Sequence, residues 1–262
     1  MDCNLTHPDL FPLAEQHARR AMDVGVTGFL VPGTLLSDSI QALELAQRMN
    51  GRGFKVHTTM GVHPYTVAQQ ETTMPVSQFV DEIRKFSFSA IGECGLDYSD
   101  GFPDRDIQLR WFQPQVALAC ELQRPLFLHE RLAHADFLNV LSRFQGRLPP
   151  VLVHCFTGTV AELDAYVKLG FFISFSGLIC REGSSSLRAA CMNVPLDKVM
   201  IETDAPYLGF KGCNPQLKRS KVYPNVPCSL PVVLDSLATA MGVPIDILAA
   251  AVTRNAHTFL GK

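Results

Sequence analysis

Short apolar runs alternate with longer stretches of helical periodicity along almost the whole chain. The short runs are rich in β-branched residues and phenylalanine, which favours buried strands. Strands are expected at 2–5, 27–32, 55–61, 89–93, 125–129, 150–155, 171–176 and 198–203. Apolar residues at helical spacing predict helices at 11–24, 36–50, 76–86, 105–122, 133–144, 160–169, 185–192, 230–241 and 245–259.

Eight strands, each followed by helical sequence, predict an α/β fold of the (β/α)8 TIM-barrel type. The chain of 262 residues has a suitable length for such a barrel, and no repeat or linker divides it. We therefore expect one metal-dependent hydrolase domain over 1–262. The alternative is an open doubly wound sheet, which would carry a G-x-G-x-x-G phosphate-binding motif after its first strand, and the chain has none there.

The composition indicates a globular protein, with 47% hydrophobic and 18% charged residues. A net charge of −2 gives no general attraction to polyanions, so a nucleic acid would need a local patch or a metal ion. The eight cysteines form no C-x-x-C pair, the N-terminus has no signal-peptide pattern, and no apolar run approaches a membrane span. These features predict a reduced, cytoplasmic protein without membrane attachment.

Ionisable residues follow several of the predicted strands. In a TIM barrel the catalytic residues lie at the carboxyl ends of the strands, where the side chains converge. A single histidine at such a position is more often structural, but a set of imidazoles and carboxylates suits Mg²⁺, Mn²⁺ or Zn²⁺. A metal ion would also compensate a buried carboxylate. The residues at the strand ends are His63, Glu93, His129, His154, Glu202 and Asp204.

Five motifs spread over the chain are more specific. They read TTMGVHP at 58–64, IGECGLDY at 91–98, PLFLHERLAH at 125–134, VLVHCFTGT at 151–159 and IETDAPYL at 201–208. Together they resemble the TatD-type metal-dependent deoxyribonucleases, which are amidohydrolase-like barrels. The resemblance implies divalent-metal-dependent hydrolysis of DNA, with 3′–5′ exonuclease action on single strands and one or two bound ions. The metal ligands that it implies are Glu93, His129, His154 and Asp204, with His63 close to the scissile phosphate.

Some positions depart from the family pattern. Many members begin with an H-x-H pair that holds a second metal, whereas Asp2 and Asn4 occupy those places here. Because an amide is a weaker ligand than imidazole, we expect the second ion to bind loosely or only with substrate. Leu132 and Val226 replace acidic residues that relatives commonly have, so the rate or the substrate preference is expected to differ.

The resemblance also suggests roles within the site. Asp204 is the expected general base for a metal-activated water, although the metal alone could activate that water. Glu202 lies two residues earlier and is expected to orient a neighbouring group. His63 is expected to donate to a phosphoryl oxygen or protonate the leaving group, unless a loop carbonyl holds it. Cys94 and Cys155 each follow a proposed ligand, so strand alternation predicts that they face away from the barrel axis.

The expected partner is DNA, above all single-stranded ends, with no obligate protein partner. His134 and Arg131 are candidate phosphate contacts, although Arg131 could equally form a surface ion pair. The segment 207–223 holds the cations Lys211 and Arg219 and the aromatic residues Tyr207 and Phe210. Cations neutralise phosphates and aromatic rings stack on unpaired bases, so this segment is a candidate single-strand contact. An ordinary solvated loop is the alternative.

Two other functions are compatible with this kind of barrel. One is hydrolysis of an ester or amide, such as a D-aminoacyl-tRNA. Many amide hydrolases use a carbamylated lysine as bridging ligand, but the strand at 89–93 offers Glu93 and no lysine, which favours the phosphodiesterase. The other is an inactive scaffold, suggested by Leu132 and Val226. The intact set Glu93, His129, His154 and Asp204 is evidence against it.

Overall fold

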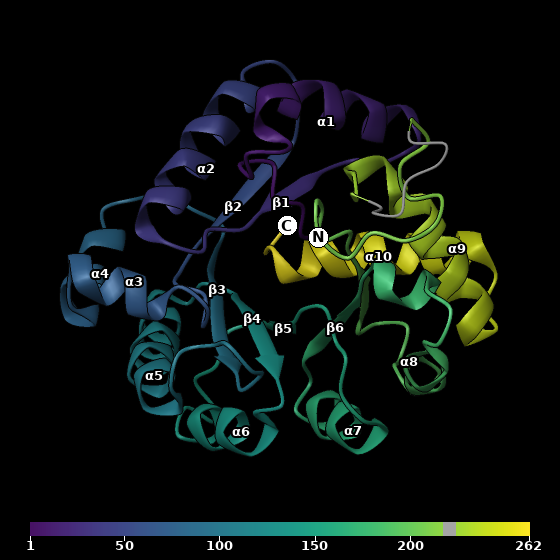
Figure 1. Ribbon diagram of the computed structural model, residues 1–262. Coiled ribbons are helices and arrows are strands. Elements are labelled where there is room, and N and C mark those ends of the chain that lie inside the picture. The colour runs from purple at the N-terminus through teal and green to yellow at the C-terminus, as the bar shows by residue number, and fades with distance from the viewer. Residues whose placement is uncertain (217–223) are drawn as a thin grey trace.

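The computed structural model describes residues 1–216 and 224–262 and shows a curled parallel sheet surrounded by helices (Figure 1). All strand pairs are parallel and follow chain order from β1 to β7. The sheet is that of an α/β fold of the TIM-barrel type, and seven of the eight predicted strands are confirmed. The strands are β1 (Phe29–Val31), β2 (Val56–Met60), β3 (Ala90–Asp97), β4 (Leu126–Arg131), β5 (Val151–Val153), β6 (Phe172–Phe175) and β7 (Val199–Ile201).

The helices surround the sheet (Figure 1). Within the described residues, the helical periodicity predicted every α-helix except α3 and missed the 3-10 helices at 177–180 and 227–229. Short 3-10 helices occur at Phe11–Leu13, Gly177–Cys180 and Pro227–Ser229. The longer helices are α1 (Ala14–Asp23), α2 (Leu36–Asn50), α3 (Val67–Thr73), α4 (Val76–Ile83), α5 (Arg105–Leu122), α6 (His134–Ser142), α7 (Val160–Lys168), α8 (Ser185–Cys191), α9 (Leu230–Met241) and α10 (Ile245–Phe259).

Within the described residues, no single helix is both long and apolar enough to cross a membrane. The bent pair Pro227–Met241 and Ile245–Phe259 meets that test by length and composition alone.

The predicted strand at 2–5 is wrong. Instead of a regular strand, Cys3 forms an isolated parallel bridge with Ala205. The Cys3 N–H donates to the Leu30 carbonyl at 3.1 Å, and the Met1 ammonium donates to the Ile201 carbonyl at 2.9 Å. The first three residues therefore lie between β1 and β7 and join the two edges of the sheet without a ladder of their own.

The interior of the curled sheet is filled from its amino-terminal end. A buried cluster contains Leu30, Ala90, Phe127, Leu152, Phe172, Met200 and Phe259. Helix α10 supplies Phe259 and is tied to the start of β7, because the Asn255 amide donates to the carbonyls of Leu196 and Val199 at 2.8 and 2.7 Å. The carboxyl ends of the strands are thereby left for other functions.

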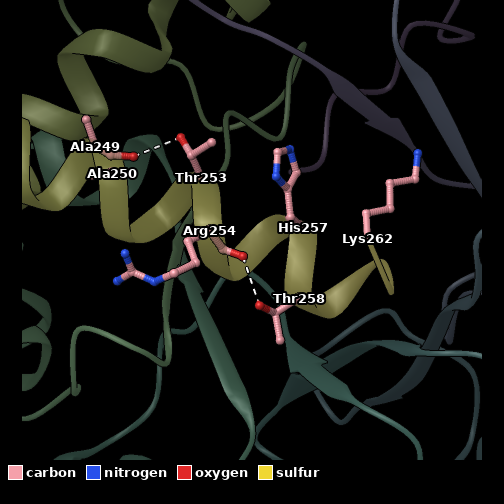
Figure 2. A pocket seen from close by; sticks show the side chains of 7 residues that line it. All are labelled: Ala249, Ala250, Thr253, Arg254, His257, Thr258 and Lys262. Carbon is pink, nitrogen blue, oxygen red and sulfur yellow. Dashed lines mark hydrogen bonds between the residues drawn. The ribbon is translucent and has the colours of Figure 1, made fainter.

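Two hollows border α10 rather than the carboxyl ends of the strands. The larger, of about 740 Å³, is lined by Phe29, Leu30, Met200, Ile201 and residues of α9 and α10. The other, of about 580 Å³, lies along α10, where the Thr253 and Thr258 hydroxyls donate to carbonyls of their own helix (Figure 2). Neither hollow contains any of the ionisable residues that follow the strands.

The position of Phe259 leads to a stability prediction. The Phe259 ring is fully buried and packs edge-on against Phe172 at 6.1 Å between ring centroids. Phe259→Ala removes this ring and leaves a cavity, so we expect a loss of about 3–5 kcal/mol in the free energy of unfolding, measured in urea. Thr258→Ala, at the exposed neighbouring position, is the control and should change it by less than about 0.5 kcal/mol. A loss below about 1 kcal/mol for Phe259→Ala would contradict the role given to α10.

Candidate active site

The two glycines around Glu93 are required by the close approach of β3 to β4. A Cβ at Gly92 would lie 2.1 Å from the Phe127 carbonyl oxygen, and a Cβ at Gly95 would lie 1.8 Å from the His129 carbonyl oxygen. The φ angles of these glycines, +142° and +152°, are also rare for other residues. The register between β3 and β4 shifts between Ile91 and Cys94. This irregular pairing surrounds Glu93, which contacts imidazoles from neighbouring elements.

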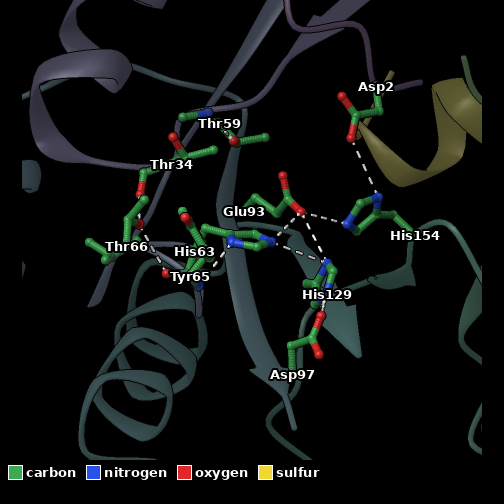
Figure 3. Close-up of polar contacts among 12 residues, drawn as sticks. Asp2, Thr34, Thr59, His63, Tyr65, Thr66, Glu93, Asp97, His129 and His154 are labelled. Carbon is green, nitrogen blue, oxygen red and sulfur yellow. Dashed lines mark hydrogen bonds and ion pairs between the residues drawn. The ribbon is translucent and has the colours of Figure 1, made fainter. Parts of the chain in front are cut away.

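Three imidazoles meet one oxygen of Glu93 (Figure 3). The distances to Glu93 Oε1 are 3.2 Å from His63 Nε2, 3.3 Å from His129 Nδ1 and 2.7 Å from His154 Nε2. His63 follows β2, His129 lies in β4 and His154 follows β5, so adjacent parts of the sheet supply the cluster. Burial acts to raise the pKa of Glu93, but the imidazoles of His154 and His63 hold it well below its usual range.

Asp97 orients His129, and sequence reasoning missed it. The Asp97 Oδ2 atom lies 2.8 Å from His129 Nε2, so the carboxylate accepts the Nε2 proton. The Nδ1 lone pair then lies 3.3 Å from His63 Nε2, from which it can accept a proton, and beside Glu93 Oε1, where a cation would bind. A carboxylate behind the imidazole is the usual arrangement for a metal-ligating histidine. The signal was present in IGECGLDY, because Glu93, Gly95 and Asp97 alternate along one strand.

His63 has a different hydrogen-bonding pattern. The Tyr65 backbone N–H donates to His63 Nδ1 at 3.1 Å, so the proton of the neutral imidazole is on Nε2. Burial lowers the pKa of His63, which favours this neutral form. His63 is therefore equipped to donate from Nε2 toward the centre of the site. That role suits it better than metal ligation, which would need a free Nε2 lone pair.

A second ionisable group lies on the other side of His154. His154 Nδ1 is 3.4 Å from Asp2 Oδ2 and 3.4 Å from Glu202 Oε1, and all three residues are buried (Figure 3 shows the Asp2 contact). The Ser174 hydroxyl donates to Glu202 Oε2 at 2.5 Å. Both carboxylate oxygens of Asp2 are buried without a hydrogen-bond partner among the described residues. Burial, with Asp204 and Glu93 adding repulsion, raises the pKa of Asp2 well above its usual range.

Asp204 completes a group of four neighbouring carboxylates. Its backbone, at φ 57°, donates to the Asp2 carbonyl at 3.1 Å. Burial raises the pKa of the Asp204 carboxyl to about 8, and repulsion from Glu202 and Glu93 adds to the shift against the attraction of His154. Four carboxylates at close quarters repel one another unless cations compensate them.

The donor atoms fit divalent cations. His63, Glu93 and His129 form one group with possible ligand atoms within 4.8 Å of one another, and Asp2, His154 and Glu202 form another. Within the first group, Glu93 and His129 would be the ligands, because His63 carries its proton on Nε2. The two Asp2 oxygens, which accept no hydrogen bond among the described residues, and the Nδ1 lone pair of His129 are what a cation would require. Mixed imidazole and carboxylate donors suit the cations expected from the sequence.

The other candidate residues lie farther out. His134 Nδ1 lies 2.9 Å from the Tyr166 hydroxyl, which itself donates to Glu130. Arg131 and Lys211 are exposed, and the structure gives neither of them an ion pair within the residues it describes. Arg219, with the rest of 217–223, lies outside the described residues. No described contact joins His134, Arg131 or Lys211 to the imidazole and carboxylate groups.

Two expectations about neighbouring residues need correction. Phe210 is buried and cannot offer its ring to a base. Cys94 belongs to the core as expected, but Cys155 does not face away from the site. Strand β5 ends at Val153, so alternation no longer applies, and burial with repulsion from Glu202 and Asp204 raises the pKa of the Cys155 thiol well above its usual range. The thiol is thus kept neutral and is a poor nucleophile.

Asn4 does not reach the site through any hydrogen bond in the described chain. Its side-chain oxygen accepts from the Thr6 hydroxyl at 3.0 Å, and its backbone N–H donates to the Ala205 carbonyl at 2.8 Å. Asp2 thus provides the carboxylate of the N-terminal segment, and Asn4 holds that segment in place.

Buried imidazoles and carboxylates at the carboxyl ends of a curled parallel sheet are typical of metal-dependent hydrolases. The family model described as TatD related DNase matches residues 1–261, and the chain belongs to this family. The proteins of Pectobacterium parmentieri (strain WPP163) and Shigella flexneri serotype 5b (strain 8401), both named 3′-5′ ssDNA/RNA exonuclease TatD, are 37% and 35% identical to it. The alignments cover 97% and 98% of this chain and 95% and 96% of those proteins.

Solved structures agree with this assignment. The TatD homologue YJJV from Escherichia coli K12 superposes with a TM-score of 0.88 at 26% identity, covering 100% of this chain and 97% of that one. A TatD family hydrolase from Entamoeba histolytica gives a TM-score of 0.85 at 22% identity, over 98% of this chain and 95% of its own. At that lower identity the likeness concerns the fold alone.

The close approach of β3 to β4 can be tested at Gly95. Gly95→Ala would place a methyl group against the His129 carbonyl, which is backbone and cannot move aside, and would also strain φ. We expect a loss of more than about 3 kcal/mol in the free energy of unfolding, or failure to fold. Gly101→Ala is the control, because its φ is +86° but its Cβ would meet nothing within 4 Å, and it should cost only about 1–2 kcal/mol. Equal losses in the two variants would show that contact with β4 is not the constraint.

Proposed function

We propose that this chain is a divalent-metal-dependent exonuclease that removes nucleotides from the 3′ ends of single-stranded DNA or RNA. The observation that carries the proposal is the meeting of three imidazole nitrogens at Glu93 Oε1, next to the separate group around Asp2. The shared name of the bacterial relatives, 3′-5′ ssDNA/RNA exonuclease TatD, supports the choice of substrate and polarity.

One cation would be held by Glu93, His129 and His154, and a second by Asp2 with Glu202 or Asp204. A bound divalent ion polarises a phosphoryl oxygen and lowers the pKa of water toward neutrality. The donor set fits Mg²⁺ or Mn²⁺, with Zn²⁺ as the alternative, and the second group contains more oxygen than nitrogen donors. Glu93 contacts both His129 and His154 through its Oε1 atom and is therefore the residue on which the first cation would depend most.

The chain's own residues would handle the protons of the reaction. His63, with its proton on Nε2, would donate to a phosphoryl oxygen or to the departing oxygen. Asp204 would accept a proton from the attacking water as the bond from phosphorus to the departing nucleotide breaks. Glu202, held by Ser174, would keep His154 oriented through its Nδ1 atom.

The proposal predicts loss of nuclease activity in Glu93→Gln and His154→Ala. Each change removes a ligand on which cation binding depends, so we expect activity on end-labelled single-stranded DNA to fall by about a hundredfold or more. That is a larger loss than changing a residue that only orients a metal ligand causes. EDTA should stop the wild-type reaction, and Mg²⁺ or Mn²⁺ should restore it. Asp164→Asn, on the exposed side of α7, is the matched control and should retain full activity.

Full activity in Glu93→Gln or His154→Ala, with the fold verified by circular dichroism, would refute the metal mechanism. The same assay with double-stranded DNA and with a D-aminoacyl-tRNA decides between functions. Deacylation without nucleotide release would replace the nuclease with the ester hydrolase.

Asp97 gives a prediction that concerns binding rather than turnover. Asp97→Asn keeps the shape but weakens the acceptor behind His129, so we expect the affinity for Mn²⁺ to fall about 10–100-fold in calorimetric titration. Asp100→Asn, an exposed neighbour, should bind Mn²⁺ as the wild type does. Unchanged affinity in Asp97→Asn would mean that His129 does not serve as a ligand through Nδ1.

A further inference from the structure

Two aromatic side chains stand exposed beside the imidazole and carboxylate groups. Among the large apolar side chains exposed in the described part of the chain, only two carry rings, Tyr65 at 62% and Tyr207 at 52% exposure. Tyr65 follows His63 by two residues, and Tyr207 follows Asp204 by three. Leaving a large ring in water forgoes the free energy of burying it. Packing within the protein does not account for two exposed rings next to these residues, whereas a ligand that covers the rings would.

Tyr65 is held firmly next to His63. Its backbone N–H donates to His63 Nδ1, and the following residue, Thr66, donates its hydroxyl to the Thr34 carbonyl at 2.5 Å. The Tyr65 ring packs at 72° against Phe102 with centroids 5.4 Å apart, and Phe102 in turn lies 6.2 Å from the His63 ring. Phe102 thus lies between the exposed Tyr65 ring and the His63 imidazole, and hydrogen bonds of Tyr65 and Thr66 fix this loop (Figure 3 shows Tyr65 beside His63).

Tyr207 is fixed in a similar way next to Asp204. The Tyr207 N–H donates to the Asp204 carbonyl at 2.8 Å. Its ring packs nearly perpendicular, at 80°, against the His7 ring with centroids 5.2 Å apart. The Tyr65 ring therefore lies after β2 and the Tyr207 ring after β7. The backbone of each tyrosine is hydrogen-bonded to a residue with a proposed role in proton transfer, His63 or Asp204.

We propose that Tyr65 and Tyr207 are stacking platforms for the two unpaired bases that flank the phosphodiester at the site. An aromatic ring stacks on any base and therefore gives affinity without sequence preference. A base within a duplex is already paired and stacked, so this contact selects single-stranded ends. With a net charge of −2, the chain has little electrostatic attraction to a polyanion, and stacking would supply affinity that charge does not. The inference rests on the proposed nuclease function and names how its substrate is held.

The test uses the full chain in Mg²⁺ with end-labelled single strands, in which an abasic residue replaces the base on one or the other side of the terminal phosphodiester. Wild type should process the complete strand with a KM roughly five- to a hundredfold lower than that of an abasic strand. Tyr65→Ala and Tyr207→Ala should each raise KM for the complete strand by a similar factor while kcat stays within about threefold. Each variant should also lose the preference for a base at one of the two positions. Tyr65→Phe and Tyr207→Phe keep the ring and should behave as wild type does.

Met192→Ala is the matched control, because Met192 is 66% exposed just after α8 but has no ring. It should leave KM and the preference for a base unchanged. Wild-type discrimination against abasic strands in both alanine variants would overturn the stacking inference while leaving the nuclease intact. Absence of cleavage of any strand by the wild type would instead refute the proposed function.

Discussion

The burial of several carboxylates against a few imidazoles at one end of a parallel sheet is the main constraint that the rest of this structure has to accommodate. Glu93 Oε1 is shared by nitrogens of His63, His129 and His154, and Asp2 and Glu202 lie on the far side of His154. Such a group costs stability until its charges are compensated. Three features hold these side chains in position: the glycines of β3 allow its close approach to β4, Asp97 orients His129, and the Ser174 hydroxyl holds Glu202.

Stability and chemistry are assigned to opposite ends of the sheet. The amino-terminal end is packed with apolar residues and covered by α10, whose Phe259 is fully buried. The carboxyl end holds the buried Asp2 carboxylate, which accepts no hydrogen bond among the described residues, and the exposed rings of Tyr65 and Tyr207. Because apolar packing at the amino-terminal end stabilises the fold, the protein tolerates the free-energy cost of burying charged side chains at the carboxyl end.

Much of this organisation could be predicted from apolar runs and from the residues that follow them. Strands β1–β7 coincide with buried apolar runs that are easily recognised in the sequence. Ionisable residues at the ends of different strands lie in contact, as expected for a barrel; Glu93 and His154 are one such pair. The stretch 2–5 resembled a strand in composition, but hydrogen bonds from Met1 and Cys3 to different neighbours replace a regular ladder. Asp97 was overlooked because its partner, His129, belongs to another strand. The side of Cys155 was misjudged because the backbone leaves the strand after Val153. Contacts between distant segments and local departures from periodicity are what a linear pattern does not contain.

Residues 1–3 form a seam between β1 and β7, and the position of Asp2 within this seam has a thermodynamic consequence. Cys3 and Met1 close the gap between β1 and β7, while Asp2, between them, directs its carboxylate toward His154. One tripeptide therefore both completes the sheet and equips the site. A cation that binds Asp2 must favour the closed seam over any state in which the sheet edges part, and a closed seam must in turn favour the cation. If Asp2 holds a cation as proposed, ion occupancy and the closure of the sheet between β1 and β7 are two readouts of a single equilibrium.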